Sequence, residues 1–272
     1  MGKVLAVTNR KGGTGKTMTS VSLGVSLVRQ GKKGLLIDAD SQHSATVSLG
    51  VKEPDKLEVS LATIMQGIIR EQGQDIINGK EADPLNGIIS HDEGIYLMPS
   101  NNGLAGMEIV LAPIMGRETV LRQYIDKVRS QYDYILIDTA PTLDLLAINA
   151  LASANSVIIP VAPKFLDAKG LELLLKSIAQ IRQYINPKLE IGGILLTMVD
   201  KRTNIAKDII TMIEQAYGAN INIFKEPIPH SVRAVETSAT GKSIFEHDPN
   251  GKVAAAYASL AQELLLGGMC HE

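Results

Sequence analysis

The sequence predicts an α/β fold: a mostly parallel, doubly wound, twisted sheet with helices on both faces, in three layers. Short uninterrupted apolar runs recur along the chain, as is typical of parallel strands buried on both faces. Segments with apolar residues at helical spacing lie between these runs, and this alternation favours a parallel sheet. The chain has 272 residues, of which 45% are apolar and 21% charged, so it can bury a sizeable core. We therefore expect a single domain over residues 1–272.

Predicted strands and predicted helices alternate along most of the chain. The runs predicted as strands are residues 4–7, 35–37, 94–99, 134–138, 157–160 and 194–197. The segments predicted as helices are residues 17–30, 168–184, 206–217 and 253–266. Residues 52–93 interrupt the alternation with prolines, Asn-Gly pairs and many charges. We expect a helix at about 57–70 and then a polar loop, as an excursion from the domain and not a second one.

Composition excludes several classes of function. Lys and Arg number 27 against 29 Asp and Glu, a net charge of −2, so nucleic-acid binding would need a local basic patch. The single Cys270 excludes a disulfide framework, a cysteine-based zinc site and a cluster held by one chain's own cysteines. The five histidines are scattered, so we predict no metal cluster. No apolar run is long enough to span a membrane, and the default compartment is the cytoplasm.

The strongest motif lies between the first predicted strand and the first predicted helix. It reads Lys-Gly-Gly-Thr-Gly-Lys-Thr over residues 11–17, in the strand–helix context that a phosphate-binding loop requires. Glycines let backbone N–H groups approach phosphate oxygens, and the helix N-terminus adds positive potential. Lys16 can reach the β- and γ-phosphates, and the Thr17 hydroxyl can bind Mg²⁺.

The loop departs from the ordinary pattern at its start. Arg10 stands where a glycine is usual, and Lys11 adds a second cation to the loop. Lys11 is either a solvated charge or a cation placed on the transferred phosphoryl group. A tight loop makes it awkward for Lys11 to reach its own nucleotide, so it could serve a neighbouring subunit instead.

Carboxylates close two of the predicted strands. Asp40 follows the second strand and is the candidate for positioning the attacking water, because strand C-termini face the ligand crevice. The alternative is a carboxylate that caps the next turn. Asp138 ends a later strand and would hold Mg²⁺ through water. Asp38 is either structural or a partner for Lys16.

The loop resembles the deviant Walker A loop of the ParA/MinD group of P-loop ATPases. The resemblance spans nearly the whole chain, is weakest over residues 52–93, and favours the ParA/Soj branch. The segments that carry it are residues 11–17, 35–42, 99–106, 132–141, 197–204 and 231–233.

The resemblance implies a P-loop NTPase fold, ATP and Mg²⁺ as cofactors, and slow ATP hydrolysis stimulated by a ParB-like partner. It implies an ATP-bound homodimer in which Lys11 reaches the partner's phosphates, and non-specific DNA binding through Arg202 and Arg233. The predicted catalytic residues are Lys11, Lys16 and Asp40, and the predicted metal-binding residues are Thr17 and Asp138. The predicted ATP-binding residues are Lys11, Gly12, Gly13, Thr14, Gly15, Lys16, Thr17, Met18, Met198, Pro229 and Ser231. Such a protein would be cytoplasmic and associated with the nucleoid.

Two other members of this group are alternatives. A MinD-like membrane-associated ATPase would end in a basic amphipathic helix, whereas residues 253–266 contain Glu263 and no lysine or arginine. We therefore expect no membrane partner. An ATPase resembling the nitrogenase iron protein would need two cysteines per chain. An N-terminal helix-turn-helix domain is not expected, because the first strand begins at about Lys3.

Overall fold

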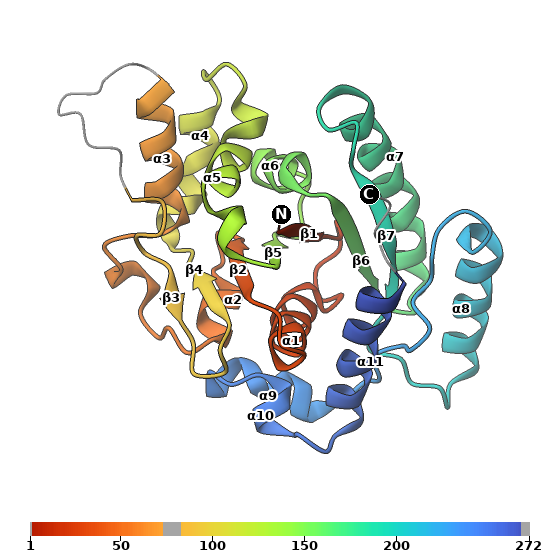
Figure 1. Cartoon of the computed structure of the whole chain (residues 1–272). Coiled ribbons are helices and arrows are strands. Elements are labelled where there is room, and N and C mark those ends of the chain that lie inside the picture. The colour runs from red at the N-terminus through yellow and green to blue at the C-terminus, as the bar shows by residue number, and fades with distance from the viewer. Residues whose placement is uncertain (1, 73–82, 268–272) are drawn as a thin grey trace.

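One seven-stranded sheet forms the centre of the protein (Figure 1). The computed structural model describes residues 2–72 and 83–267. Its strands are β1 (Lys3–Val7), β2 (Gly34–Ala39), β3 (Ile89–Ser90), β4 (Tyr96–Met98), β5 (Tyr134–Thr139), β6 (Ser156–Val161) and β7 (Glu190–Leu196). Their order is β3-β4-β2-β5-β1-β6-β7, and every neighbouring pair is parallel except β3 with β4. The predicted fold class is confirmed.

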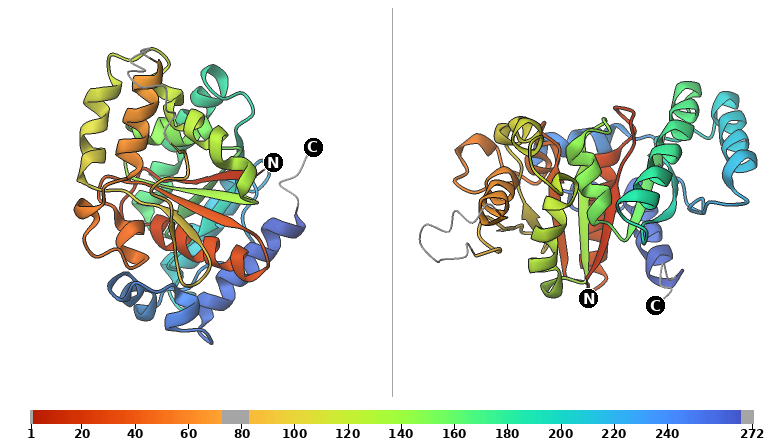
Figure 2. Two further views of the ribbon diagram at one scale, coloured as in Figure 1. Left: turned by 60° about the vertical axis from the view of Figure 1, so that its left-hand side comes forward. Right: turned by 90° about the horizontal axis from the view of Figure 1, so that it is seen from above.

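Helices cover both faces of the sheet (Figures 1 and 2). On one face lie α1 (Lys16–Arg29), α2 (Ser44–Ser48), α9 (Val232–Thr240), α10 (Ile244–His247) and α11 (Lys252–Leu266). On the other lie α3 (Leu61–Gln72), α4 (Met107–Leu111), α5 (Val120–Val128), α6 (Leu145–Ser153), α7 (Phe165–Tyr184) and α8 (Asn204–Tyr217). The view from above shows α8 outside α7, beyond the β7 end of the sheet (Figure 2). No helix in the described residues is both long and apolar enough to cross a membrane.

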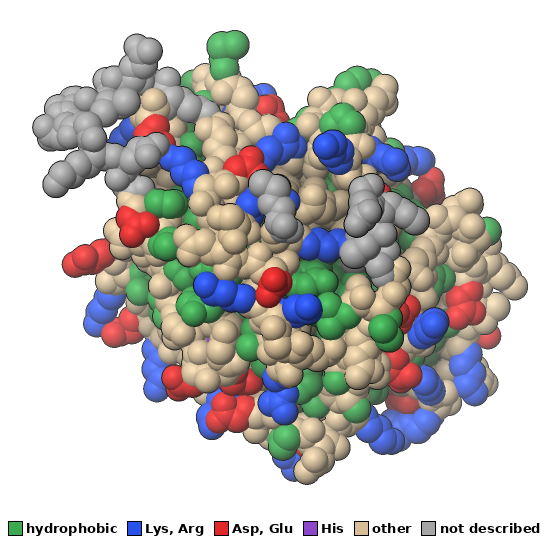
Figure 3. Space-filling model, viewed as in Figure 1, with side chains coloured by type: hydrophobic (Ala, Val, Ile, Leu, Met, Phe, Trp, Pro, Cys, Tyr) green, Lys and Arg blue, Asp and Glu red, His purple; other side chains and the backbone are tan. Residues whose placement is uncertain are grey.

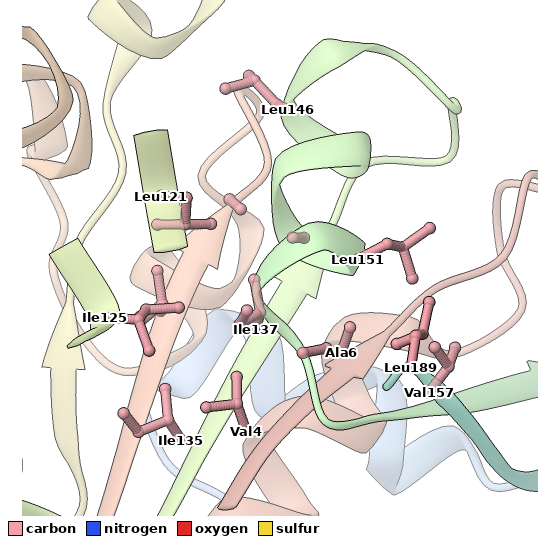
Figure 4. Close-up of a cluster of buried hydrophobic side chains, with 14 of the residues drawn as sticks. Val4, Ala6, Leu121, Ile125, Ile135, Ile137, Leu146, Leu151, Val157 and Leu189 are labelled. Carbon is pink, nitrogen blue, oxygen red and sulfur yellow. The ribbon is translucent and has the colours of Figure 1, made fainter. Parts of the chain in front are cut away.

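Side chains of successive strand residues enter two different cores. Val4 and Ala6 of β1 pack in the core beneath α5 and α6, together with Ile135 and Ile137 of β5 (Figure 4). Leu5 and Val7 of β1, with Leu36 and Leu136, pack in the second core against α1 and α11. Successive side chains of a strand point to opposite faces, so a strand buried on both faces must be apolar at every position. This is why the strands appear in the sequence as unbroken apolar runs.

The carboxyl ends of the central strands carry the polar residues. β5 pairs with β1 on one side and with β2 on the other, and the register places Asp138 opposite both Val7 and Asp38. Asp40 directly follows β2, and α1 begins at Lys16 after the loop that leaves β1. Both predicted carboxylates and the predicted phosphate loop therefore meet at one edge of the sheet.

The excursion at residues 52–93 is better integrated than its polarity suggests. Its helix begins at Leu61 and not near residue 57, because Pro54–Lys56 form a 3₁₀ turn and Ser60 and Thr63 exchange hydrogen bonds at the helix start. Leu61 and Met65 are fully buried in the core beneath α5. β3 then adds an antiparallel strand to the sheet. Of the predicted polar loop, residues 73–82 with the Asn78-Gly79 pair lie outside the described residues.

The outer edge of β7 is paired with an irregular segment at residues 221–229. Ile194 exchanges backbone hydrogen bonds with this segment, donating to Asn222 at 2.8 Å and accepting from Phe224 at 3.0 Å. Farther along, the Ile228 N–H donates to Leu196 at 2.8 Å. The edge that β7 would otherwise expose is thus satisfied by the chain itself.

Candidate functional site

The loop between β1 and α1 is held by hydrogen bonds from both sides. The Asn9 amide donates to the Pro160 carbonyl at 2.7 Å, and its oxygen accepts from the Lys11 N–H at 3.1 Å. The Thr197 hydroxyl donates to the Thr14 carbonyl at 2.8 Å. The carboxyl ends of β6 and β7 therefore fix the shape of the loop before any ligand binds.

Glycines allow the loop its conformation. Gly13 and Gly15 have φ values of 71° and 80°, a left-handed region that other residues rarely adopt. A Cβ atom added at Gly12 or Gly13 would meet nothing within 4 Å, so this part of the loop borders open space. Gly15 directly precedes α1, whose N-terminal N–H groups have no partner within the helix. The loop is therefore suited to an anion.

Lys16 lies deep in this loop. Its side chain is 7% exposed, and its Nζ donates to the Lys11 carbonyl at 3.0 Å. Burial lowers the pKa of Lys16, while the nearby Asp138 and Asp40 carboxylates raise it. A buried ammonium between a loop carbonyl and two carboxylates is well placed to exchange that carbonyl for phosphate oxygens.

Thr17 and Asp138 are in direct contact. The Thr17 hydroxyl donates to Asp138 Oδ2 at 2.7 Å, and the Ser20 hydroxyl donates to Asp138 Oδ1 at 2.8 Å. Asp138 is fully buried, and burial together with the Asp38 charge raises its pKa to about 7, against the effect of the two hydroxyl donors. Our sequence reasoning missed Ser20, although its spacing of three residues from Thr17 places both on one face of a helix.

The residues around Thr17 fit a divalent cation that binds together with a ligand. Hydroxyl and carboxylate oxygens are the donors that Mg²⁺ prefers. Within the described residues, no three His, Cys, Asp or Glu side chains group in a way that could hold a metal ion. A cation at Thr17 would therefore take further oxygens from a bound phosphate or from water.

Asp38 has a structural role and holds α2. Its Oδ2 accepts from the Thr46 N–H at 2.7 Å and from the Thr46 hydroxyl at 2.6 Å, and its Oδ1 accepts from the Asp40 N–H at 3.2 Å. Complete burial raises its pKa to about 6. We considered a structural role for Asp38 and a role as partner of Lys16. These hydrogen bonds support the structural role, and none of them involves Lys16.

Asp40 is oriented by its neighbours. Its Oδ1 accepts from the Gln42 N–H at 2.9 Å, and its backbone carbonyl accepts from the Ser100 hydroxyl at 2.8 Å. The Ser100 N–H in turn donates to the Thr46 hydroxyl oxygen at 2.9 Å. The network fixes the backbone on both sides of Asp40, and one oxygen of its carboxylate has no partner in this set.

A cleft of about 720 Å³ opens beside the loop. That volume is in the range of ligand-binding pockets. The predicted residues that line it are Gly12, Gly13, Gly15, Lys16, Thr17, Met18, Asp40, Met198, Pro229 and Ser231. Lys11, Thr14 and Asp138 are not in this lining; Thr14 and Asp138 are buried behind it and Lys11 is half-buried. The structure therefore brings segments from four distant parts of the sequence to one cavity.

Met198 has an unusual backbone conformation at the cleft. Its φ is 53°, which is uncommon for a residue other than glycine. Hydrogen bonds of its two neighbours hold it there, from the Thr197 N–H to Val161 at 2.9 Å and from the Val199 N–H to Ile228 at 3.0 Å. Such outliers are enriched at ligand sites, where the surrounding structure maintains them.

The two arginines predicted for DNA binding are both exposed. Arg202 forms a bidentate ion pair with Asp200, with both N–O distances at 2.8 Å, and this lowers the pKa of Asp200 to about 2. Arg233 lies in the first turn of α9. On the face shown in Figure 3, basic and acidic side chains are interspersed, as expected from the net charge of −2.

The fold and the loop define a class of protein. A glycine-rich loop joins a buried parallel strand to a helix, a lysine and a threonine open that helix, and a strand-end aspartate contacts the threonine. This is the nucleotide site of a P-loop NTPase.

Comparison with known proteins identifies the family. A family model described as an AAA domain matches residues 2–191. The sporulation initiation inhibitor protein Soj of Bacillus subtilis is 38% identical over 98% of this chain and 100% of its own. The chromosome-partitioning ATPase Soj of Thermus thermophilus is 34% identical over 96% of this chain and 94% of its own. The chain belongs to the ParA/Soj family of partitioning ATPases.

Solved structures agree with this fold. A structure described as cobyrinic acid a,c-diamide synthase from Mycobacterium smegmatis, with bound ADP and magnesium, is 33% identical, with a TM-score of 0.82 over 97% of this chain and 94% of that chain. The septum site-determining protein MinD of Pyrococcus horikoshii, complexed with Mg-ADP, has a TM-score of 0.72 at 22% identity over 99% of this chain and 98% of that chain. At 22% identity, the similarity to MinD shows only that the two proteins share a fold.

Proposed function

We propose that this chain, acting as one domain over residues 1–272, is a Mg²⁺-dependent ATPase that partitions DNA. ATP drives formation of a homodimer, the dimer binds DNA without sequence specificity, and slow hydrolysis to ADP and phosphate releases it. A ParB-like partner stimulates the hydrolysis. The observation that carries the proposal is the cleft lined by the loop, Thr17 and Asp40, with Asp138 hydrogen-bonded to Thr17.

The loop binds the phosphates of ATP. N–H groups of Gly12 to Thr17 surround the phosphate oxygens, and the Lys16 ammonium leaves the Lys11 carbonyl to neutralise the β- and γ-phosphates. The Thr17 hydroxyl and, through water, Asp138 would hold Mg²⁺. When bound, this ion neutralises charge that develops between the β- and γ-phosphates. The 33% identical structure with bound ADP and magnesium described above and the oxygen donors at Thr17 support this assignment.

Asp40 positions the water that attacks the γ-phosphate. Its carboxylate borders the cleft, and the Gln42 N–H bond leaves one oxygen for that water. Lys11 acts on the nucleotide of the partner subunit, where a second cation stabilises the transferred phosphoryl group. Its place outside its own cleft lining supports a role across the dimer.

Adenine occupies the part of the cleft away from the loop. Met18, Met198, Pro229 and Ser231 line the cleft and are the proposed contacts with the nucleoside. The apolar surface of two methionines and a proline suits a stacked purine ring.

Arg202 and Arg233 bind DNA phosphates. Asp200 already accepts two hydrogen bonds from Arg202, so DNA must compete with this carboxylate. An exposed ion pair contributes little, and a phosphate can displace it. Each phosphate contact that is lost should reduce the slope of log affinity against log salt by about 0.9.

Packing of α11 supports this function over a membrane-associated one. Val253, Ala256, Leu260 and Leu264 are buried against α1 and the sheet, so the apolar face of the helix is already covered. We therefore propose a cytoplasmic, nucleoid-associated protein.

The test is sizing and DNA retention of the wild type with ADP, ATP and a non-hydrolysable analogue. We expect a monomer with ADP, and with the analogue a dimer that DNA retains. A monomer in all three states, or equal DNA retention in all three, would refute the proposal. ATP-dependent pelleting with anionic liposomes would favour the MinD-like alternative.

A further inference from the structure

One wall of the cleft is held from outside by the excursion segment. Lys242 and Ser243, between α9 and α10, and Ile244, the first residue of α10, line the cleft. The Ser243 N–H donates to Glu93 Oε1 at 2.8 Å, and the Ser243 hydroxyl donates to Glu93 Oε2. Ser243 is 1% exposed and Glu93 half-buried, and they are separated by 150 residues in the sequence. Glu93 is outside the cleft lining, so it can act on a ligand only through this wall.

A second contact fixes the same turn. His91 Nδ1 accepts from the Glu93 N–H at 3.2 Å, which leaves the ring proton on Nε2. His91 Nε2 therefore donates to the Gly241 carbonyl, at 3.3 Å. On the other side, a Cβ at Gly241 would be 2.7 Å from the Gly50 Cα, so the backbones of the two glycines are in contact. The turn that bears Ser243 is thus held at three points.

The wall faces the part of the cleft beyond the phosphates. Ile244 packs in one core with Val21 and Tyr257, which also line the cleft, and the Tyr257 hydroxyl lies 3.2 Å from the Thr19 hydroxyl of α1. Val21 is in the second turn of α1, whereas phosphates would bind at its first residues, Lys16 and Thr17. None of the hydrogen bonds of Lys16 or Thr17 described above involves this wall.

We propose that Glu93 is a positioning residue for the nucleoside part of the bound nucleotide. Its carboxylate holds Ser243, and Ser243 holds α10 by accepting the Phe245 N–H at 3.1 Å. A bidentate, charge-assisted and half-buried contact is strong enough to fix a turn between two short helices. The inference rests on the proposed function, because it names the part of ATP that this wall contacts.

The experiment separates the nucleoside from the phosphates. Affinities for ATP, ADP and inorganic tripolyphosphate are measured by titration of wild type, Glu93→Ala and Glu93→Gln. We expect Glu93→Ala to weaken ATP and ADP binding about tenfold and to leave tripolyphosphate binding and kcat within twofold. Glu93→Gln should regain most of the affinity, because an amide can accept the Ser243 N–H and donate to its hydroxyl oxygen. Asp92→Ala is the matched control: it removes the same charge from an exposed neighbour in the same turn.

The outcomes distinguish the inference from its premise. Unchanged ATP affinity in folded Glu93→Ala would overturn the inference about Glu93. An equal loss of tripolyphosphate affinity would also overturn it, because the substitution would then disturb the whole cleft. Should Glu93→Ala fail to fold, Ser243→Ala removes the hydroxyl bond to Glu93 together with the cap on the Phe245 N–H, and the same pattern of affinities decides. A wild type that binds no ATP would refute the proposed function and this inference with it.

Discussion

Replacing Asp40 by asparagine tests the chemistry most directly. The side chain is 7% exposed, and an asparagine Oδ1 can still accept the Gln42 N–H, so the fold should be retained. What is lost is the carboxylate that would orient and deprotonate water. Removing a general base lowers rates about 10²- to 10⁴-fold, or about 2.7 to 5.4 kcal/mol in the activation free energy.

The variant should bind ATP as well as the wild type does, because the proposed phosphate contacts come from the loop, Lys16 and Thr17. Phosphate release with ATP and Mg²⁺ measures turnover, titration measures affinity, and sizing should detect a dimer that persists because ATP is not consumed. Asp92→Asn controls for loss of an exposed carboxylate. Turnover within threefold of wild type would refute the assignment, and a loss of ATP affinity equal to the loss of turnover would place Asp40 in binding instead.

The remaining predictions concern binding and stability. Lys16→Ala should abolish nucleotide binding in a titration, since its ammonium is the buried cation of the loop; retained affinity would remove it from the site. Arg202→Glu combined with Arg233→Glu should reduce DNA retention and the salt slope while ATPase activity persists; unchanged retention would mean that DNA binds elsewhere. Gly24→Ala would place a methyl group 2.5 Å from Ile95 Cδ1 in a fully buried core. Overpacking costs about 1–3 kcal/mol against about 1 kcal/mol of helix propensity, so the urea midpoint should fall by the equivalent of about 1 kcal/mol, and a rise would contradict the packing.

The strands were predictable because burial on both faces leaves a simple pattern. Every predicted apolar run overlaps a strand, and the bounds of run and strand agree within a few residues at each end. Our reading omitted α5, although Val120, Tyr124 and Val128 recur at helical spacing and are all buried. It also omitted α6, whose nine residues are almost uniformly apolar and therefore show little periodicity. β3 has two residues, too few for any local pattern, and it exists only because β4 pairs with it.

The candidate site also contains parts that the sequence predicts and parts that it does not predict. The loop and its threonine could be predicted because their chemistry requires neighbouring residues. The pairing of Thr46 with Asp38 could not, because it depends on how α2 returns to the end of β2. The contact between Glu93 and Ser243 spans 150 residues and has no local signal. The resemblance placed Met198, Pro229 and Ser231 at one site, and all three line the cleft, but their contacts with adenine stay a prediction.

The segment at residues 221–229 both pairs with the edge of the sheet and contributes to the lining of the cleft. By pairing with the outer side of β7 at Ile194 and Leu196, it covers backbone to which another copy could add a strand, so assembly at this edge would use side-chain surfaces. The same segment ends at Pro229, which lines the cleft. A displacement of β7 would therefore also move this part of the cleft lining. At Pro229, the shape of the cleft therefore depends on the rigidity of the sheet.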